Sequence, residues 1–248
     1  RTSLRPGLLN TYASNEKHEK NGIKLFEVGR IYLPRANDLP EEREILAGIL
    51  GGPRLESSWL SGEDTSDFYD AKGILETFLS RLKVKAIFQP AEDQTLLAGK
   101  TAAVIIGEER VGIVGEVHPK TAALFEISTQ PIVLFELDLV KLLTSISSVY
   151  RYKPIPRFPG NSRDIAMIVD NTLAASRVQE VIESFPLVDE VTLFDVYSGE
   201  QVPHGKKSLA LSIRFQSGER TLTNEEVNQA QQQIVDRLQR EFGATLRS

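Results

Sequence analysis

The clearest pattern of apolar and polar positions lies in the C-terminal part of the chain. Residues 163–169, 191–197 and 207–215 carry apolar side chains at alternate positions, which predicts three strands. Residues 174–185 and 223–242 repeat apolar side chains at helical spacing, which predicts two helices. A short strand over 244–247 follows. The predicted order of elements is therefore β-α-β-β-α-β.

Local signals support these elements. Thr223 and Glu226 have the spacing of a capping box at the start of the second helix, and Gly243 suits the position just after its end. In the strand over 207–215, alternate side chains must point to opposite faces. The apolar set of that strand is Leu209, Leu211, Ile213 and Phe215, and the small or polar set is Ser208, Ala210, Ser212 and Arg214.

The N-terminal part mixes many strands with few helices. Apolar spacing predicts helices over 1–20 and 68–82 and strands over 23–33, 43–50, 84–89, 101–106, 111–117 and 132–139. This composition indicates an antiparallel sheet with helices packed on it, an α+β fold.

Between the two parts, residues 144–162 contain Pro154, Pro156 and Pro159 and show no regular period. We expect one domain over 1–148, a linker over 149–153 and a ferredoxin-like domain over 154–248.

Composition limits the possible functions. The chain has 29 Lys and Arg against 34 Asp and Glu, a net charge of −5, so neither half is a basic nucleic-acid-binding domain and any RNA must meet a local patch. There are no cysteines, which excludes disulfides and thiol catalysis and fits a cytoplasmic protein. No apolar run reaches the roughly 18 residues of a membrane helix. Because the sequence begins at Arg1 rather than Met, we expect a piece of a longer polypeptide.

No group of residues has the pattern of a catalytic or metal site. The three histidines stand far apart, and the carboxylates near residue 67 precede or begin a predicted helix, where they favour its dipole. The glycines near residue 113 indicate close backbone approach rather than a phosphate loop. These histidines, carboxylates and glycines are His18, His118, His204, Glu63, Asp64, Asp67, Asp70, Gly112 and Gly115.

Several segments together resemble the C-terminal portion of bacterial phenylalanine–tRNA ligase β subunits. The first group is LRPGLL (4–9), FEVGRIYLP (26–34), DFYDAKGILE (67–76), VGIVGEVHP (111–119) and LFELDL (134–139). The second group is RFPGNSRD (157–164), LFDVYSG (193–199), GKKS (205–208) and RTLT (220–223). The resemblance implies a degenerate class II synthetase-like antiparallel sheet with helices, followed by a ferredoxin-like βαββαβ anticodon-binding domain.

The resemblance also implies that the first domain is inactive. Class II synthetases carry a GxxFRxE motif whose arginine clamps the ATP α-phosphate. The matching strand here starts at Gly29 and has Leu33 in place of that arginine and Arg35 in place of the glutamate. Leucine cannot stabilise a phosphate, so we expect no catalytic residue, cofactor or metal in this chain. ATP and Mg²⁺ would belong to the holoenzyme, an (αβ)₂ heterotetramer with a catalytic α subunit.

An inactive fold retained for assembly should expose apolar side chains, and Leu8, Leu9, Tyr12 and Trp59 are the candidates. The second domain would bind the anticodon region of tRNA(Phe) on its open sheet face, by stacking and phosphate contacts. The candidate RNA-binding residues are Arg157, Phe158, Arg163, Tyr197, Lys206, Lys207, Ser212, Arg214 and Arg247. Two alternatives stay open: these charges are solvated strand ends with Phe158 covering the core, or the chain is a stand-alone interaction or regulatory module without tRNA binding.

Overall fold

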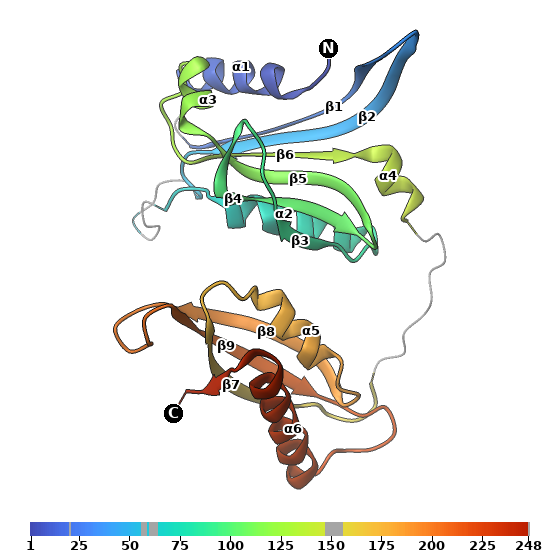
Figure 1. The fold of residues 1–248 in the computed structure, drawn as a ribbon, viewed down its shortest axis with the longest axis vertical. Coiled ribbons are helices and arrows are strands. Elements are labelled where there is room, and N and C mark those ends of the chain that lie inside the picture. The colour runs from blue at the N-terminus through green and yellow to red at the C-terminus, as the bar shows by residue number, and fades with distance from the viewer. Residues whose placement is uncertain (20, 56–58, 60–63, 147–155, 248) are drawn as a thin grey trace. The chain divides into compact units, whose positions relative to one another are not determined.

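The computed structural model describes residues 1–19, 21–55, 59, 64–146 and 156–247. The chain divides into two compact units, Arg1–Tyr150 and Arg151–Ser248, which are both drawn in Figure 1. The predicted linker over 149–153 lies outside the described residues. No helix in the described part of the chain is both long and apolar enough to cross a membrane.

The first unit is built on a six-stranded sheet in which every neighbouring pair is antiparallel, with the order β1-β2-β6-β5-β4-β3. Its strands are β1 (Ile23–Arg35), β2 (Asp38–Gly51), β3 (Ile87–Pro90), β4 (Leu96–Ile106), β5 (Glu109–Val117) and β6 (Ile132–Asp138). As the sequence predicts, the fold is α+β. Added β-carbons at Gly112 and Gly115 would lie 2.3 Å from the Glu136 carbonyl oxygen and 2.6 Å from Thr101 Oγ1, which confirms close approach at both glycines.

Helices cover both faces of this sheet. The helix α1 (Arg5–Glu16) buries Leu8, Leu9 and Tyr12 in a core with β1, β2 and β6. The helix α2 (Phe68–Arg81) buries Ala71, Leu75 and Leu79 in a second core on the other face. Within the N-terminal segment predicted as a helix over 1–20, α1 is shorter at both ends. Pro6 stands in its first turn, where proline is tolerated because that N–H needs no partner.

The sequence pattern did not predict two short helices. The helices α3 (Pro119–Leu124) and α4 (Leu139–Thr144) each have six residues, too few to show a helical period. Each begins after a capping side chain. His118 Nδ1 accepts a hydrogen bond from the Lys120 N–H at 3.1 Å, and Asp138 Oδ1 accepts one from the Val140 N–H at 3.1 Å.

The second unit has the predicted β-α-β-β-α-β order. Its sheet runs β10-β7-β9-β8, and its helices are α5 (Ala175–Glu183) and α6 (Asn224–Phe242). The strands are β7 (Asn161–Asp170), β8 (Val188–Tyr197), β9 (Lys206–Phe215) and β10 (Thr245–Leu246). Both helices pack on one face and share one apolar core with the strands. The capping box of Thr223 and Glu226 is present, and Gly243 adopts φ 61°, which favours glycine.

Candidate nucleic-acid interface

The register of β9 separates its two predicted faces. Leu209, Leu211, Ile213 and Phe215 are completely buried in the core under α5 and α6. The alternate residues Ala210 and Ser212 are half-buried on the face without helices, and Arg214 is exposed. Ser208 shares that face but is only 3% exposed. The open face is therefore lined by small side chains, as the sequence indicates, which lets another molecule approach the backbone closely.

Two candidate residues lie on the other face of the sheet, contrary to the expectation that they join the open-face set. Arg163 pairs with Ile213, and its guanidinium donates hydrogen bonds to Asn161 Oδ1 at 2.6 Å and to Asn224 Oδ1 at 3.2 Å. Lys207 pairs with Val169 and donates from Nζ to the Asn171 carbonyl at 3.0 Å. Because successive side chains of a strand point to opposite faces of the sheet, a difference of one position in the sequence places a side chain on the other face. Arg163 therefore supports the start of α6.

The remaining candidates fall into two groups at opposite ends of the sheet. Lys206 and Arg214 begin and nearly end β9, so roughly 26 Å separates them at the usual rise of an antiparallel strand. Arg214 lies near Gly160, with Arg157 and Phe158 just before it in the chain. Tyr197 lies toward the other end, because it pairs with Ser208, and the Arg247 guanidinium extends to the Tyr197 ring. The nine predicted residues do not form one site.

At the Arg214 end, the charges are neutralised within the unit. The Arg214 guanidinium lies 3.7 Å from Asp189 Oδ2 and 3.8 Å from Glu190 Oε2. Phe158 is half-buried, and its carbonyl accepts a hydrogen bond from Gln216 Nε2 at 2.6 Å. Arg157 is exposed. A phosphate would have to compete with two carboxylates for Arg214, which makes this end the weaker RNA-binding candidate.

At the other end, an aromatic ring and a guanidinium form a stacked pair. The Arg247 guanidinium carbon lies 5.1 Å from the centre of the Tyr197 ring, and its Nη2 donates to Gln201 Oε1 at 2.6 Å. A β-carbon at Gly199 would lie 2.3 Å from the Tyr197 hydroxyl, so glycine leaves the space into which the phenol extends. Lys206 lies at the same end of β9. Ser208 and Ala210 lie beside this Tyr197–Arg247 pair and provide little steric obstruction.

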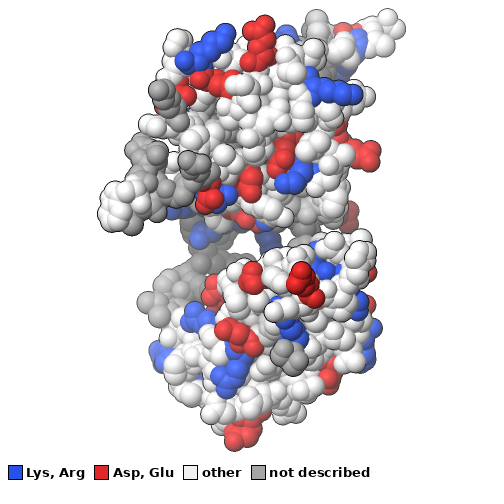
Figure 2. Space-filling view, turned by 90° about the vertical axis from the view of Figure 1, so that its left-hand side faces the viewer, with Lys and Arg blue, Asp and Glu red and all other residues white. Residues whose placement is uncertain are grey.

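Sequence reasoning missed a carboxylate in this region. A register shift between Leu193 and Asp195 places Asp195, rather than Phe194, opposite Ala210. Asp164 and Asp170 also share the open face, because they pair with Ser212 and Lys206. An irregularity of this kind cannot be read from alternation, which assumes an unbroken period of two. Figure 2, which views the molecule from the left-hand side of Figure 1, shows acidic and basic side chains interspersed on that side.

The positions that correspond to the synthetase phosphate clamp do not fit ATP. Leu33 is half-buried and packs against the core beneath α1, and Arg35 forms an ion pair with Glu41 at 3.0 Å. Hydrogen bonds from Arg43 and from Arg35 hold the pKa of Glu41 below its ordinary value. Both arginines are thus held by a carboxylate of the chain itself, and we derive no step of ATP chemistry through this strand.

The carboxylates at the start of α2 cap the helix or lie close to an arginine. Asp67 and Asp70 form the capping box of α2, which confirms capping as their role, and Asp64 lies 3.8 Å from Arg54. Glu63 lies outside the described residues. Among the described side chains no three His, Asp or Glu residues are grouped as a metal site would require.

The apolar residues expected on the surface of the first unit divide between core and surface. The expectation that Leu8, Leu9 and Tyr12 are exposed is wrong, because α1 buries all three against the sheet. Burial also raises the pKa of Tyr12 to about 12. Trp59 is exposed, as expected.

Comparisons with known proteins account for both units. Residues 1–139 match the family model "Phenylalanyl tRNA synthetase beta chain CLM domain", and residues 156–247 match "Ferredoxin-fold anticodon binding domain". The chain is 42% identical over 248 residues to a phenylalanine–tRNA ligase β subunit of Dehalococcoides mccartyi, covering 100% of this chain and 30% of that one. It is 40% identical over 252 residues to the β subunit of Geobacillus kaustophilus, covering 31% of that chain.

A solved pyrrolysyl-tRNA synthetase of Desulfitobacterium hafniense is similar over 58% of this chain and 49% of that one, with a TM-score of 0.43 and 19% identity. The chain spans about 30% of the length of the two β subunits that it matches. The two family models follow each other in the order that the sequence motifs predict, and the first alone covers more than half of the chain. This chain therefore belongs to the phenylalanine–tRNA ligase β-subunit family.

Proposed function

We propose that this chain is a non-catalytic part of a phenylalanine–tRNA ligase. Its second unit binds the anticodon region of tRNA(Phe), and its first unit joins the catalytic α subunit in a cytoplasmic (αβ)₂ heterotetramer. The holoenzyme uses ATP and Mg²⁺ to attach phenylalanine to the tRNA, and this chain supplies no residue to that chemistry. Family membership supports the proposal, as does the loss of the phosphate clamp at Leu33 and Arg35.

The observation that carries the RNA part of the proposal is the Tyr197–Arg247 pair beside a strand of small residues. Proteins recognise unpaired RNA bases by stacking them on aromatic rings or guanidinium planes and by contacting nearby phosphates. The pair offers both kinds of surface, and Lys206 adds a cation at the same end of β9. Asp195, which is exposed opposite Ala210, adds an acceptor for contacts with base edges. Together these side chains can hold a loop base without a large basic surface.

The test measures binding of the chain to an anticodon stem-loop of tRNA(Phe) and to one with a changed anticodon, across a salt series. Tyr197→Ala should weaken binding by ~1–3 kcal/mol if the ring stacks on a base, and more for the cognate loop. Lys206→Ala should flatten the dependence of log affinity on log salt by about 0.7 and affect both loops alike. Fluorescence anisotropy reports both effects.

Arg240→Ala is the matched control, because Arg240 is an exposed arginine of α6, which covers the opposite face of the sheet. Equal losses from Arg240→Ala and Tyr197→Ala would contradict the proposed docking face. The rival function, a stand-alone interaction module, predicts no salt-dependent preference for tRNA(Phe) at all. Binding of the stem-loop through Arg214 instead would favour the other end of the sheet.

A further inference from the structure

Gln201 contacts the arginine of the Tyr197–Arg247 pair from a third segment of the chain. Its Oε1 accepts the hydrogen bond from Arg247 Nη2 at 2.6 Å, and the Arg247 guanidinium carbon lies 5.1 Å from the centre of the Tyr197 ring. Tyr197 is the last residue of β8, Gln201 lies in the connection between β8 and β9, and Arg247 follows β10. The guanidinium is therefore held between an aromatic ring and a side-chain amide.

The connection that carries Gln201 is itself hydrogen-bonded and packed. The Val202 N–H donates to the Gly199 carbonyl at 2.9 Å, which closes a β-turn with Gln201 as one of its central residues. The Val202 side chain is only 8% exposed, whereas Gln201 is exposed. Because the turn is fixed on the unit by Val202, the Gln201 amide meets Arg247 from a defined position.

Arg247 is also fixed through its backbone, since its N–H donates to the Ala166 carbonyl of β7 at 2.8 Å. A guanidinium carries several N–H donors in one plane, and this plane suits the oxygens of a phosphate. Among the described residues, Gln201 Oε1 is the one acceptor bonded to the Arg247 guanidinium. The contacts within the chain thus orient the guanidinium and leave most of its donors for another molecule.

An uncharged acceptor leaves the positive charge of Arg247 available. No carboxylate of the described residues forms an ion pair with it. The other cations of the open face are less available, because two carboxylates lie close to Arg214, and Lys206 stands opposite Asp170 in the sheet.

Two further carboxylates near this pair oppose the binding of phosphate. Asp195 on β8 and Glu200 in the turn are both exposed. A phosphate that approaches this region is repelled by both, so its attraction depends on a cation that is charged and correctly placed. Arg247 is that cation, and Gln201 decides both its position and its remaining charge.

We propose that Gln201 is a positioning residue for RNA, which holds Arg247 against the Tyr197 ring with an uncharged acceptor so that an ordered, fully charged guanidinium meets a phosphate of the anticodon loop. A side chain that is ordered before binding loses less entropy on binding, which favours affinity. A glutamate in place of Gln201 would hold Arg247 at least as firmly but would neutralise it. The proposal rests on the proposed function, because it concerns the same RNA site.

The test measures the affinity of the full chain for the anticodon stem-loop of tRNA(Phe) by fluorescence anisotropy across a salt series. Gln201→Glu should weaken binding roughly tenfold or more and flatten the dependence of log affinity on log salt by about 0.7, because one phosphate contact loses its charge. Gln201→Ala releases Arg247 but leaves it charged. It should weaken binding about two- to tenfold with the salt dependence unchanged.

Gln233→Glu is the matched control, since Gln233 is an exposed glutamine of α6, which covers the opposite face of the sheet. It adds the same negative charge and should leave binding within about twofold of the unmodified chain, because salt screens charges beyond about 10 Å. Urea unfolding of each variant separates folding from binding. Gln201→Glu should keep or raise the unfolding midpoint, since a carboxylate strengthens the hydrogen bond to Arg247. If Gln201 only fastened the chain after β10, Gln201→Glu would then bind RNA normally.

A double-mutant cycle shows whether Gln201 acts through Arg247. In a chain that already carries Arg247→Ala, Gln201→Ala should cause no further loss of affinity, because there is no guanidinium left to position. An equal loss with and without Arg247 would mean that Gln201 acts on the RNA directly or on the fold, and the positioning role would be wrong.

The outcomes separate this inference from the proposed function. If the unmodified chain binds the stem-loop but Gln201→Glu and Gln201→Ala bind as tightly as Gln233→Glu, the positioning role is overturned and the RNA-binding role stands. If the unmodified chain does not bind the stem-loop, the RNA-binding role fails and the inference fails with it.

Discussion

At the scale of single residues, Arg5 connects three segments of the first unit through one guanidinium. Its Nε donates to Glu136 Oε2 at 2.7 Å, and its Nη1 donates to Asp93 Oδ1 at 2.8 Å and to Thr95 Oγ1 at 2.6 Å. Burial opposes its charge, but Glu136 and Asp93 outweigh that effect, so the pKa of Arg5 is raised. This arginine ties the start of α1 to β6 and to the loop before β4.

Arg5→Ala should destabilise the first unit by ~3 kcal/mol, because Asp93 and Glu136 have side chains only 20% exposed and would lose their cation. Urea unfolding followed by circular dichroism measures the change. Arg30→Ala removes an exposed ion pair with Glu42 and should change stability by less than ~1 kcal/mol. Equal losses of unfolding free energy in both variants would show that the contacts of Arg5 stabilise the unit no more than an exposed ion pair does.

Glu226 makes a pH-dependent contribution to the stability of the second unit. Hydrogen bonds from Arg220 and from the Thr223 N–H lower its pKa to about 2. A carboxyl with a lowered folded-state pKa stabilises the fold above its unfolded-state pKa of about 4.3, and the contribution disappears as the pH falls toward 2. Glu226→Gln should therefore reduce the loss of stability between about pH 4.5 and 2. Titration of the Glu226 carboxyl carbon by NMR checks the cause, and a midpoint near the ordinary value of about 4.3 would refute it.

At the scale of secondary-structure elements, glycines decide where side chains from neighbouring strands can lie. Gly48 makes room for Phe135, Gly112 lets β5 approach β6, and Gly199 accommodates the Tyr197 hydroxyl. By contrast, a β-carbon at Gly73 on α2 would meet nothing within 4 Å. Glycine is therefore required for close packing at Gly48 and Gly112 in the strands, whereas Gly73 only lowers the stability of the helix.

Gly48→Ala should destabilise the chain by ~1–3 kcal/mol, since its methyl group would force the Phe135 ring out of position. Gly73→Ala should have the opposite sign and stabilise α2 by ~0.5–1 kcal/mol, because alanine is the better helix former and the space is free. Thermal unfolding of the two variants beside the unmodified chain measures both effects. A neutral Gly48→Ala would show that the ring can move without loss of packing.

At the scale of the whole molecule, the chain combines a unit that matches the phenylalanyl-tRNA synthetase β-chain CLM domain with a unit that matches the ferredoxin-fold anticodon-binding domain. Leu33 packs into the core and Arg35 is bound to Glu41, so neither side chain is free to hold a nucleotide. The purified chain should accordingly form no phenylalanyl-adenylate. Pyrophosphate exchange assays with phenylalanine, ATP and Mg²⁺ measure this directly. Activity above background that Arg35→Ala abolishes would show that the strand does bind ATP.

The sequence alone determined much of the architecture, because periodicity and capping are local properties. The six predicted strands of the first unit, the longer helices, the order of the second unit and the capping residues Thr223 and Glu226 all follow from neighbours along the chain. The resemblance to synthetases, and with it the prediction that Leu33 and Arg35 replace a phosphate clamp, likewise depends only on residue types in the sequence.

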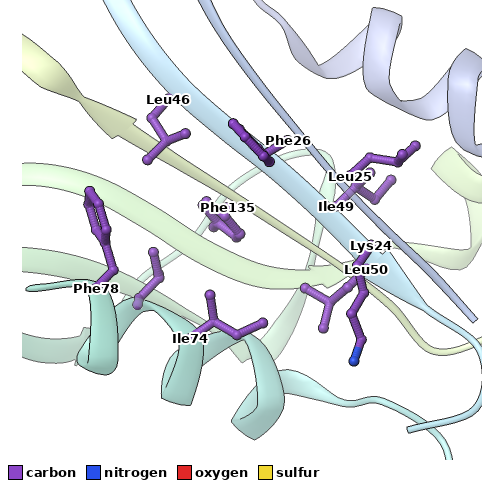
Figure 3. A pocket seen from close by; sticks show the side chains of 10 residues that line it. Lys24, Leu25, Phe26, Leu46, Ile49, Leu50, Ile74, Phe78 and Phe135 are labelled. Atoms are coloured by element: carbon purple, nitrogen blue, oxygen red, sulfur yellow. The ribbon is translucent and has the colours of Figure 1, made fainter. Parts of the chain in front are cut away.

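The tertiary structure decided which residues meet, because register and burial depend on partners distant in the chain. The pairing of Arg163 with Ile213 turned it away from the open face, and the bulge before Asp195 added a carboxylate to it. Burial of Leu8 on α1, and exposure of Phe26 beside α2, depend on which part of the sheet each helix covers. The apolar groove that α2 forms with β1, β2 and β6 (Figure 3) and the Tyr197–Arg247 pair exist only because strands and helices far apart in the sequence pack side by side.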